Sequence, residues 1–213
     1  SKITGNERQE IYKYVVENLE VNPNLPPLFR DIFSNPPNPF NDVKKLFEFL
    51  KIIDCFSYEN SETLGNSYEY LLSKTGAQGK LGQFRTPRHI IDFIVEIINP
   101  KSTERILDPS CGTAGFLVSA FKHIKSNEQD ISAEELLNLS KNLVGYDIEP
   151  KMIRISLLNL FLQGFQTPKI IEQDLLSDDS NWNKYFDVIL ANPPFFTPKG
   201  GISPHREIGR AHV

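Results

Sequence analysis

The stretch Phe186-Asp-Val-Ile-Leu-Ala-Asn-Pro-Pro-Phe-Phe196 sets a short apolar run directly before an asparagine, two prolines and two aromatic residues. The run has the length of a buried parallel strand. Proline cannot donate a ladder hydrogen bond, so we expect the strand to end at Asn192. The pattern then predicts an amide side chain and a rigid carbonyl at the carboxyl end of a strand, where open α/β sheets bind ligands. A plain Asn-Pro turn is the alternative that this stretch alone leaves open.

Short apolar runs alternate with helical patterns over the residues that precede this stretch. The predicted strands and the helices between them lie at residues 105–108, 115–124, 133–141, 143–147, 150–164, 169–171 and 188–191. Strands that alternate with helices of this length form βαβ units and a parallel sheet. A further helix is expected to begin at Thr86, as its N-cap, with Pro87 at the first helical position.

The first part of the chain has a different pattern, without strands. Amphipathic helices are predicted near residues 7–20, 42–55 and 61–74, and a proline-rich stretch at 22–39 reads as extended or turn-like chain. We therefore expect a small helical arm over residues 1–80 and an α/β domain over residues 81–213. The arm shows no residues with evident chemistry.

The composition excludes several classes of protein. The chain has 213 residues and a formal net charge of −4, so a contact with nucleic acid must be a local patch or belong to a partner. No apolar run approaches the length of a membrane span. The two cysteines fit a reducing compartment, and their spacing from the histidines matches no zinc pattern. We expect a cytoplasmic protein without a metal.

Acidic residues stand at the ends of three predicted strands. Asp108 precedes the loop Pro-Ser-Cys-Gly-Thr-Ala-Gly115, which connects a strand to a helix and favours a ligand with a positive amino group over a pyrophosphate. Asp147 ends the next strand and can accept hydrogen bonds from a ribose diol. Asp174 follows the third strand, where it could receive an adenine amino group. Each alone could be an ordinary surface acid, but three in register favour a nucleotide-like ligand.

These motifs together resemble the modification (methyltransferase, M) subunit of type I restriction–modification systems, among the N6-adenine DNA methyltransferases. The matching pieces, in the family's order, are Gly82-Gln-Phe-Arg-Thr-Pro-Arg-His-Ile90, Asp108-Pro-Ser-Cys-Gly-Thr-Ala-Gly-Phe-Leu117, Gly145-Tyr-Asp-Ile-Glu-Pro150, Gln173-Asp174 and Asn192-Pro-Pro-Phe195. Tyr68-Glu-Tyr-Leu-Leu72 also resembles the end of the family's helical N-terminal region. The resemblance implies a Rossmann-like S-adenosylmethionine-dependent methyltransferase sheet, incomplete at its C-terminal side, after a small helical domain.

The resemblance also implies which residues bind the cofactor, S-adenosylmethionine. Thr86 would hold its carboxylate, and Asp147 its ribose hydroxyls. Its amino-acid end would lie against Asp108 and the loop, and its adenine against the chain after the third strand. The remaining implied contacts are Gly112, Thr113, Gly115, Asp174 and Leu175.

The same resemblance assigns methyl transfer to the opening stretch. Asn192 and the Pro193 carbonyl would accept both N–H bonds of the amino group of a flipped-out adenine. Pro194 would keep this turn rigid, and Phe195 would stack on the extruded base. The implied partners are double-stranded DNA, a specificity subunit that chooses the DNA site, and a restriction subunit.

Some positions depart from the family's pattern. Arg85 stands where the family often has Tyr. Ala114 replaces a usual glycine, which is acceptable if that position has helical dihedrals and predicts weakened cofactor binding. Cys111 is interpreted as a small loop residue rather than a nucleophile, and His89 as a solvated side chain.

Two rival functions and one structural expectation stay open. The chain could be a related methyltransferase that modifies RNA or protein glutamine, or a non-catalytic fragment that binds cofactor or partner subunits. The predicted strand at residues 188–191 would leave an apolar edge, which isolated proteins avoid. We therefore expect a longer polypeptide, truncated here after the fourth strand, or a partner or another copy of the chain that covers this edge.

Overall fold

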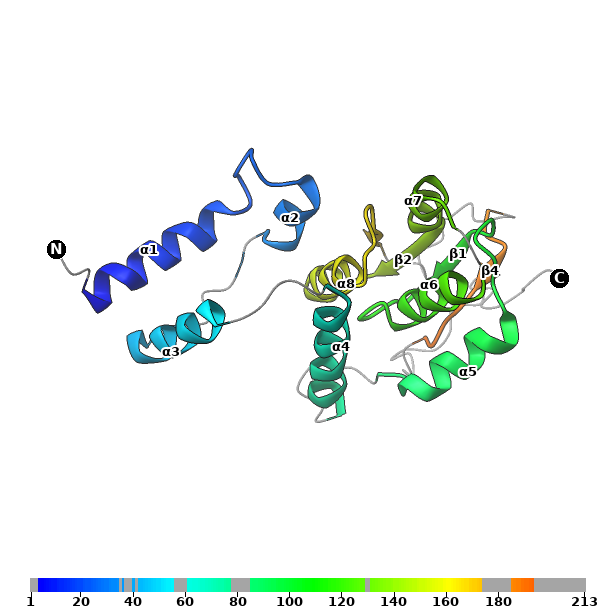
Figure 1. The fold of residues 1–213 in the computed structure, drawn as a ribbon, viewed down its shortest axis with the longest axis horizontal. Coiled ribbons are helices and arrows are strands. Elements are labelled where there is room, and N and C mark those ends of the chain that lie inside the picture. The colour runs from blue at the N-terminus through cyan, green and yellow to red at the C-terminus, as the bar shows by residue number, and fades with distance from the viewer. Residues whose placement is uncertain are drawn as a thin grey trace, which may run out of the picture.

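The computed structural model describes residues 4–34, 36, 40, 42–55, 61–77, 85–128, 131–173 and 185–193, without the side chains of residues 61, 62 and 75–77. Helices α1 and α3 lie at one end of the molecule, and a parallel sheet with its helices lies at the other (Figure 1). The expected α/β fold after a helical N-terminal region is confirmed.

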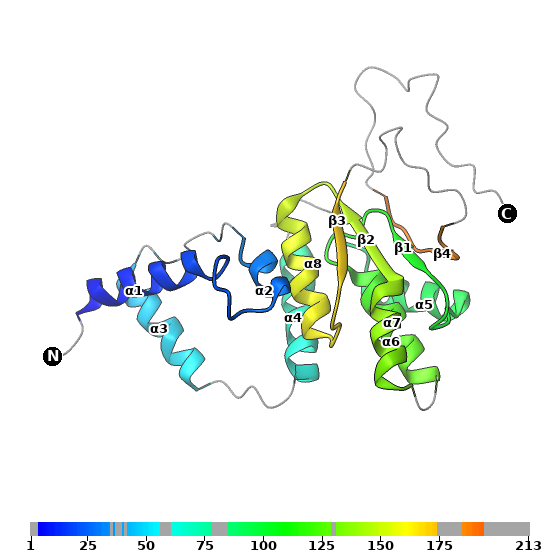
Figure 2. The ribbon, with the colours of Figure 1, turned by 90° about the horizontal axis from the view of Figure 1, so that it is seen from above.

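The sheet has four parallel strands in the order β3-β2-β1-β4 (Figure 2). Their bounds are Ile106–Asp108 for β1, Leu143–Asp147 for β2, Lys169–Glu172 for β3 and Val188–Ile189 for β4. All four strands run in the same direction, so their carboxyl ends lie at one edge of the sheet. The site residues predicted from the sequence, among them Asp108, Asp147 and Asn192, lie at these carboxyl ends.

The central strands differ from the outer ones in burial. Every residue of β1 and β2 is buried, whereas β3 and β4 are partly exposed. Beyond β4, the Leu190 N–H donates to the Leu107 carbonyl over 2.9 Å, which extends the pairing past the strand. Among the described residues no strand pairs with the other side of β4, where Ile189 is 63 % exposed. The expectation that this edge is covered stays a prediction.

The described helices of the α/β part are α5 (Arg88–Ile98), α6 (Gly115–Asn127), α7 (Ala133–Asn142) and α8 (Pro150–Leu162). One large apolar core joins strand residues such as Ile106 and Leu143 with α5 and α6. Phe121 and Phe165 pack there with ring centroids 4.2 Å apart. Strand residues of the opposite face, such as Val144, form a separate small cluster. The large core fixes the two central strands, and with them the ends that carry the site.

The N-terminal helices are α1 (Gly5–Asn18), α2 (Pro27–Ile32), α3 (Val43–Asp54) and α4 (Ser61–Ala77). Asp42 caps α3 by accepting from the Lys44 N–H. Helix α2 contradicts the expected extended chain at 22–39, because Pro27 occupies the first helical turn, where proline is tolerated. It is stabilised by Phe29, which packs edge-to-face on Phe161 of α8 at 4.8 Å.

Helix α4 packs directly on the helices of the sheet. A Cβ atom added at Gly65 would lie 2.6 Å from the Leu162 carbonyl oxygen at the end of α8, so glycine permits this close approach. Lys122 of α6 donates to the Asn66 side chain over 2.7 Å. By contrast, α1 has no buried residue. The predicted division at residue 80 stays a proposal, but α4 is in contact with the α/β part.

Within the described part of the chain, no helix combines the length and the apolar character needed to cross a bilayer.

Candidate functional site

Asp108 ends β1 and is 1 % exposed. Its Oδ1 accepts the Ser110 N–H over 3.2 Å. The pKa of Asp108 is raised to about 7: burial is the largest cause, the Ser110 hydrogen bond lowers the pKa, and the Asp147 carboxylate raises it. A buried acid of this kind ionises most readily beside a positive charge. The site therefore suits a cationic ligand.

Asp147 ends β2, and both of its oxygens accept backbone N–H groups. The Gly112 N–H donates to Oδ2 over 3.0 Å, and the Glu149 N–H donates to Oδ1 over 2.9 Å. Gly112 has a φ of +53°, a conformation that glycine adopts without strain. The Asp147 carboxylate thus connects the loop after β1 to the turn after β2. Each oxygen retains a second acceptor position for a ligand.

Backbone contacts with β2 hold the loop that follows Asp108. The Cys111 N–H donates to the Tyr146 carbonyl over 2.8 Å. A Cβ at Gly145 would lie 2.6 Å from the Ile170 Cδ1 atom and 3.0 Å from the Cys111 Sγ atom, so a larger residue there would have to displace these side chains. Burial raises the pKa of the Cys111 thiol well above its ordinary value, and Asp108 and Asp147 add to that. Cys111 is therefore a small packed loop residue, as interpreted, because it does not form the thiolate that a nucleophile needs.

The expectation that an alanine at position 114 has helical dihedrals is wrong. The φ of +61° and ψ of +32° of Ala114 are left-handed, not right-handed helical. A residue with a Cβ is strained there by about 1–2 kcal/mol. The next residue, Gly115, begins α6, and a Cβ added there would lie 3.0 Å from the Ile91 Cδ1 atom. The tight turn therefore suits glycine at 114 better than the alanine present.

Thr86 and Asn192, far apart in the sequence, meet at the same edge of the sheet. The Asn192 Nδ2 atom donates to the Thr86 Oγ1 atom over 2.8 Å. The prediction of Thr86 as the N-cap of α5 is wrong, because Pro87 occupies that position and no side chain caps the helix. The Thr86 hydroxyl instead accepts from Asn192. The sequence placed both residues in one site, and the structure brings them into contact.

Several predicted site residues lie outside the described residues: Asp174, Leu175, Pro194 and Phe195. Pro193 is described and exposed. Thr113 is 8 % exposed within the loop, and its carbonyl accepts from Asn159 over 2.8 Å. The structure therefore brings together Thr86 with Asn192, and Asp108 with Asp147 and the loop.

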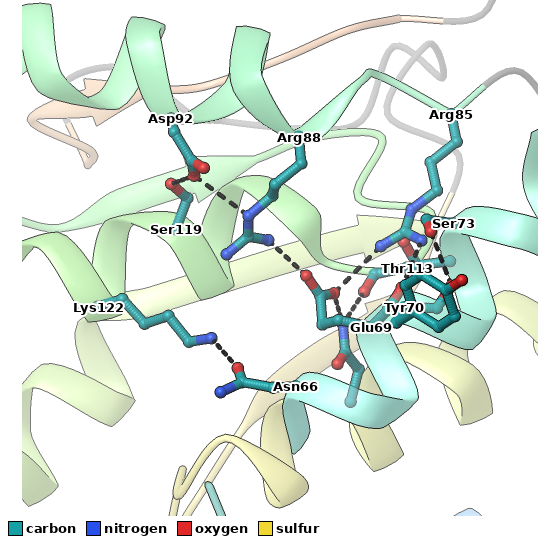
Figure 3. Close-up of polar contacts among 11 residues, drawn as sticks. Asn66, Glu69, Tyr70, Ser73, Arg85, Arg88, Asp92, Thr113, Ser119 and Lys122 are labelled. Carbon is teal, nitrogen blue, oxygen red and sulfur yellow. Dashed lines mark hydrogen bonds and ion pairs between the residues drawn. The ribbon is translucent and has the colours of Figure 1, made fainter. Parts of the chain in front are cut away.

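A polar cluster beside this site was missed from the sequence (Figure 3). Glu69 of α4 forms ion pairs with Arg85 at 3.1 Å and with Arg88 at 2.6 Å. It also accepts from Asn159 of α8 over 2.7 Å. The available signal was a glutamate inside an apolar helical stripe, between Tyr68 and the following leucines, where a charge needs a partner.

The buried polar atoms around the loop fit a polar, positively charged ligand. Among the described residues, Ser110 Oγ is buried without a hydrogen-bond partner, beside Asp108. Two carboxylates face the loop, and α6 begins without a side-chain cap. Unpaired buried polar atoms are costly unless a ligand or solvent satisfies them. These features fit the amino-acid and ribose portions of S-adenosylmethionine.

A parallel sheet with acids after its two central strands and Asn-Pro-Pro after its edge strand defines an α/β methyltransferase domain. The chain belongs to the N-6 DNA methylase family, whose model matches residues 59–201. The methyl donor of this class is S-adenosylmethionine. The match begins just before α4.

Curated relatives are similar to this chain over most of its length. The EcoEI type I restriction enzyme methylase subunit of Escherichia coli is 34 % identical over 155 residues, which is 72 % of this chain and 31 % of that protein. The MjaIX methylase subunit of Methanocaldococcus jannaschii is 34 % identical over 167 residues, covering 77 % of this chain and 28 % of its own length. The chain thus spans about a third of these relatives.

A solved structure shares the fold over most of the chain. It comes from work on complex assembly and conformational transition of the type I restriction–modification system. It is 27 % identical with a TM-score of 0.73, and the match covers 91 % of this chain and 42 % of that one. The predicted family and fold class are therefore confirmed.

Proposed function

We propose that this chain supplies the methyl-donor site and the amino-acceptor residues of a DNA adenine-N6 methyltransferase subunit in a type I restriction–modification system. The observation that carries the proposal is the shared edge of the sheet. There the carboxylates of Asp108 and Asp147 meet around one loop, and Asn192 is hydrogen-bonded to Thr86. The names of the relatives support this activity, which belongs to proteins longer than this chain.

The donor half would bind S-adenosylmethionine, which supplies an electrophilic methyl group. Asp147 would accept the ribose hydroxyls with its free lone pairs, and Asp108 with the loop would hold the positively charged amino group. Thr86 has a donor to spare: its oxygen accepts from Asn192, so its own hydrogen can be donated to the cofactor carboxylate. Asp174 and Leu175 would contact the adenine ring.

The acceptor half depends on the orientation of the Asn192 amide. Because Nδ2 donates to Thr86, Oδ1 is the atom left to accept from the target amino group. Together with the Pro193 carbonyl it would accept both N–H bonds and favour a pyramidal nitrogen. The nitrogen lone pair would then bond to the methyl carbon as the carbon–sulfur bond breaks; the electron pair of that bond would leave on the sulfur of the thioether product, and the surplus amino proton would pass to solvent. Alignment of the reacting atoms could lower the barrier by up to about 7–11 kcal/mol.

DNA binding would need help from other subunits. The net charge of −4 makes this chain a weak partner for phosphates by itself. We propose that a specificity subunit supplies the DNA contacts and the choice of site, and that a restriction subunit shares the complex. The target base would be flipped out and stacked on Phe195, which could offset about 1–3 kcal/mol of the cost.

The test is transfer of a radiolabelled methyl group to adenine-containing duplex DNA, with and without the specificity subunit. The proposal predicts incorporation with the subunit present, and none into duplex whose target adenines already carry N6-methyl groups. Incorporation into RNA or a glutamine peptide instead would favour a related amino-group methyltransferase. Cofactor binding without any transfer, in the complete complex, would favour a non-catalytic subunit.

A further inference from the structure

Glu69 of α4 is a nearly buried carboxylate whose two oxygens serve three side chains of other segments. Its side chain is 12 % exposed. Oε1 accepts from Arg85 Nη2 over 3.1 Å and from Asn159 Nδ2 over 2.7 Å, and Oε2 accepts from Arg88 Nη1 over 2.6 Å. A carboxylate with this many charged and polar partners adopts one position. It also offsets the burial of Arg85, whose pKa is lowered first by desolvation.

One branch of these contacts leads to the cofactor loop. Asn159 is fully buried, and its Nδ2 donates one hydrogen to Glu69 and the other to the Thr113 carbonyl. Its Oδ1 has no partner among the described residues. Among the described residues, the hydrogen bonds that set the orientation of this amide are therefore those with Glu69 and Thr113. Two hydrogen bonds separate Glu69 from the backbone that follows Gly112.

The other branch leads to the acceptor side of the site. Arg85 and Arg88 flank Thr86 in the sequence, and both bind Glu69 (Figure 3). Thr86 in turn accepts from Asn192. Arg88 is also paired with Asp92, one helical turn further along α5, at 3.1 Å. Glu69 thus restrains the segment whose hydroxyl orients the Asn192 amide.

We propose that Glu69 is a positioning residue that holds the cofactor loop and the Thr86–Asn192 pair in mutual register, so that α4 is part of the methyl-transfer machinery. This inference rests on the proposed function, because it concerns the same site. If Glu69 has this role, a displacement of α4 should disturb the cofactor loop and the Thr86–Asn192 pair at the same time. A glutamate that only attached α4 to the sheet would affect stability and leave the site unchanged.

The test compares Glu69→Gln with Asn159→Ser and a matched control, Glu96→Gln, which changes an exposed glutamate of α5. Each variant is titrated with S-adenosylmethionine by calorimetry well below its melting temperature. Its kcat is measured in the complex assembled with the specificity subunit. We expect Glu69→Gln to weaken cofactor binding about tenfold and to lower kcat. Asn159→Ser breaks only the loop branch, so it should weaken binding and leave kcat nearly unchanged.

The double variant Glu69→Gln/Asn159→Ser shows whether the two residues act on the cofactor loop through one chain of hydrogen bonds or independently. If Glu69 acts on the loop through Asn159, the double variant should bind the cofactor about as well as the weaker single variant. Wild-type affinity and kcat in folded Glu69→Gln and Asn159→Ser would overturn the inference while the proposed function stands. If Glu69→Gln does not fold, normal cofactor affinity in Asn159→Ser overturns it. A wild-type chain that does not bind the cofactor contradicts the proposed function itself.

Discussion

The donor and acceptor halves of the site are built in different ways. Asp108 and Asp147 end the two fully buried central strands and are 1 % and 8 % exposed. Asn192 follows β4, a two-residue edge strand whose Ile189 is 63 % exposed, and its side chain is hydrogen-bonded to Thr86. The core positions the donor half, whereas a hydrogen bond to an upstream segment orients the acceptor half.

This difference predicts that substitutions made directly in one half of the site leave the other half nearly unaffected. A change in the donor half should alter cofactor affinity and the stability of the fold, because its carboxylates hold the loop together. A change in the acceptor half should alter turnover and leave both of those nearly unchanged. The following variants test the separation.

Replacing the acceptor amide should have the largest effect. Asn192→Ala removes an acceptor aimed at charge that develops in the transition state, so turnover should fall by about 10²–10³-fold. Cofactor affinity and melting temperature should stay close to wild type, because the side chain lies on the sheet's edge. Radiolabelled methyl transfer by the assembled complex measures the loss. Retained turnover would remove Asn192 from the reaction.

Neutralising the buried acid of β1 should change stability in a pH-dependent way. Asp108 has a folded pKa of about 7, above its ordinary value, so the wild-type chain loses stability as pH rises towards and through 7. In Asp108→Asn, the amide oxygen can still accept from the Ser110 N–H, and the side chain does not ionise, so the variant does not lose stability in this way as pH rises. It should be more stable at pH 8, on the order of a few kcal/mol, with little difference at pH 4.

Urea unfolding at both pH values measures this prediction, and calorimetry should show weaker cofactor binding by the same variant. An Asp108→Asn chain that is less stable than wild type at pH 8 would show that the carboxylate is already satisfied in the free protein.

Removing the hydroxyl that orients the amide should have a moderate effect. Thr86→Val deletes the acceptor for Asn192 Nδ2, which is worth about 0.5–1.5 kcal/mol, so turnover should fall roughly 2- to 12-fold. It also deletes the proposed donor to the cofactor carboxylate, so cofactor affinity should fall as well, and turnover is therefore compared at saturating cofactor. Thr103→Val, at an exposed turn, is the matched control. Equal turnover in both variants would mean that the amide is oriented by other contacts.

The smallest effect is expected at the left-handed turn before α6. Ala114→Gly relieves an unfavourable conformation but adds freedom to the unfolded chain, so the net gain should be below about 1 kcal/mol. Ala120→Gly, at a buried right-handed position in α6, should instead destabilise the chain. Thermal melting of the two variants compares them directly. If Ala114→Gly and Ala120→Gly both lower the melting temperature, the backbone at Ala114 is not strained.

The sequence predicted the parts of the fold that depend on local pattern. The run at 143–147 is apolar and strand-like in its own right, and β2 has those bounds. The acids at 108 and 147 were found because residues at the carboxyl ends of parallel strands must share an edge. Such predictions need only neighbouring residues and the rule for parallel sheets.

What the sequence did not predict depends on contacts between distant segments. Helix α2 begins at Pro27, within a Pro26-Pro27 pair that reads as a break in the sequence, and it is stabilised by an aromatic contact with α8. Ala114 gives no local sign that its backbone is left-handed. Glu69 looked like one charge on an amphipathic helix, because its partners lie 16 to 90 positions away.

The central claim is that the strand-end acids form the methyl-donor site and Asn192 forms a separate acceptor. Calorimetric titration of S-adenosylmethionine into the wild-type chain, Asp147→Ala and Asn192→Ala tests it most directly. We predict saturable binding by the wild-type chain, loss of at least about tenfold in affinity for Asp147→Ala, and near-normal binding for Asn192→Ala. Equal affinity of all three proteins would contradict the assignment.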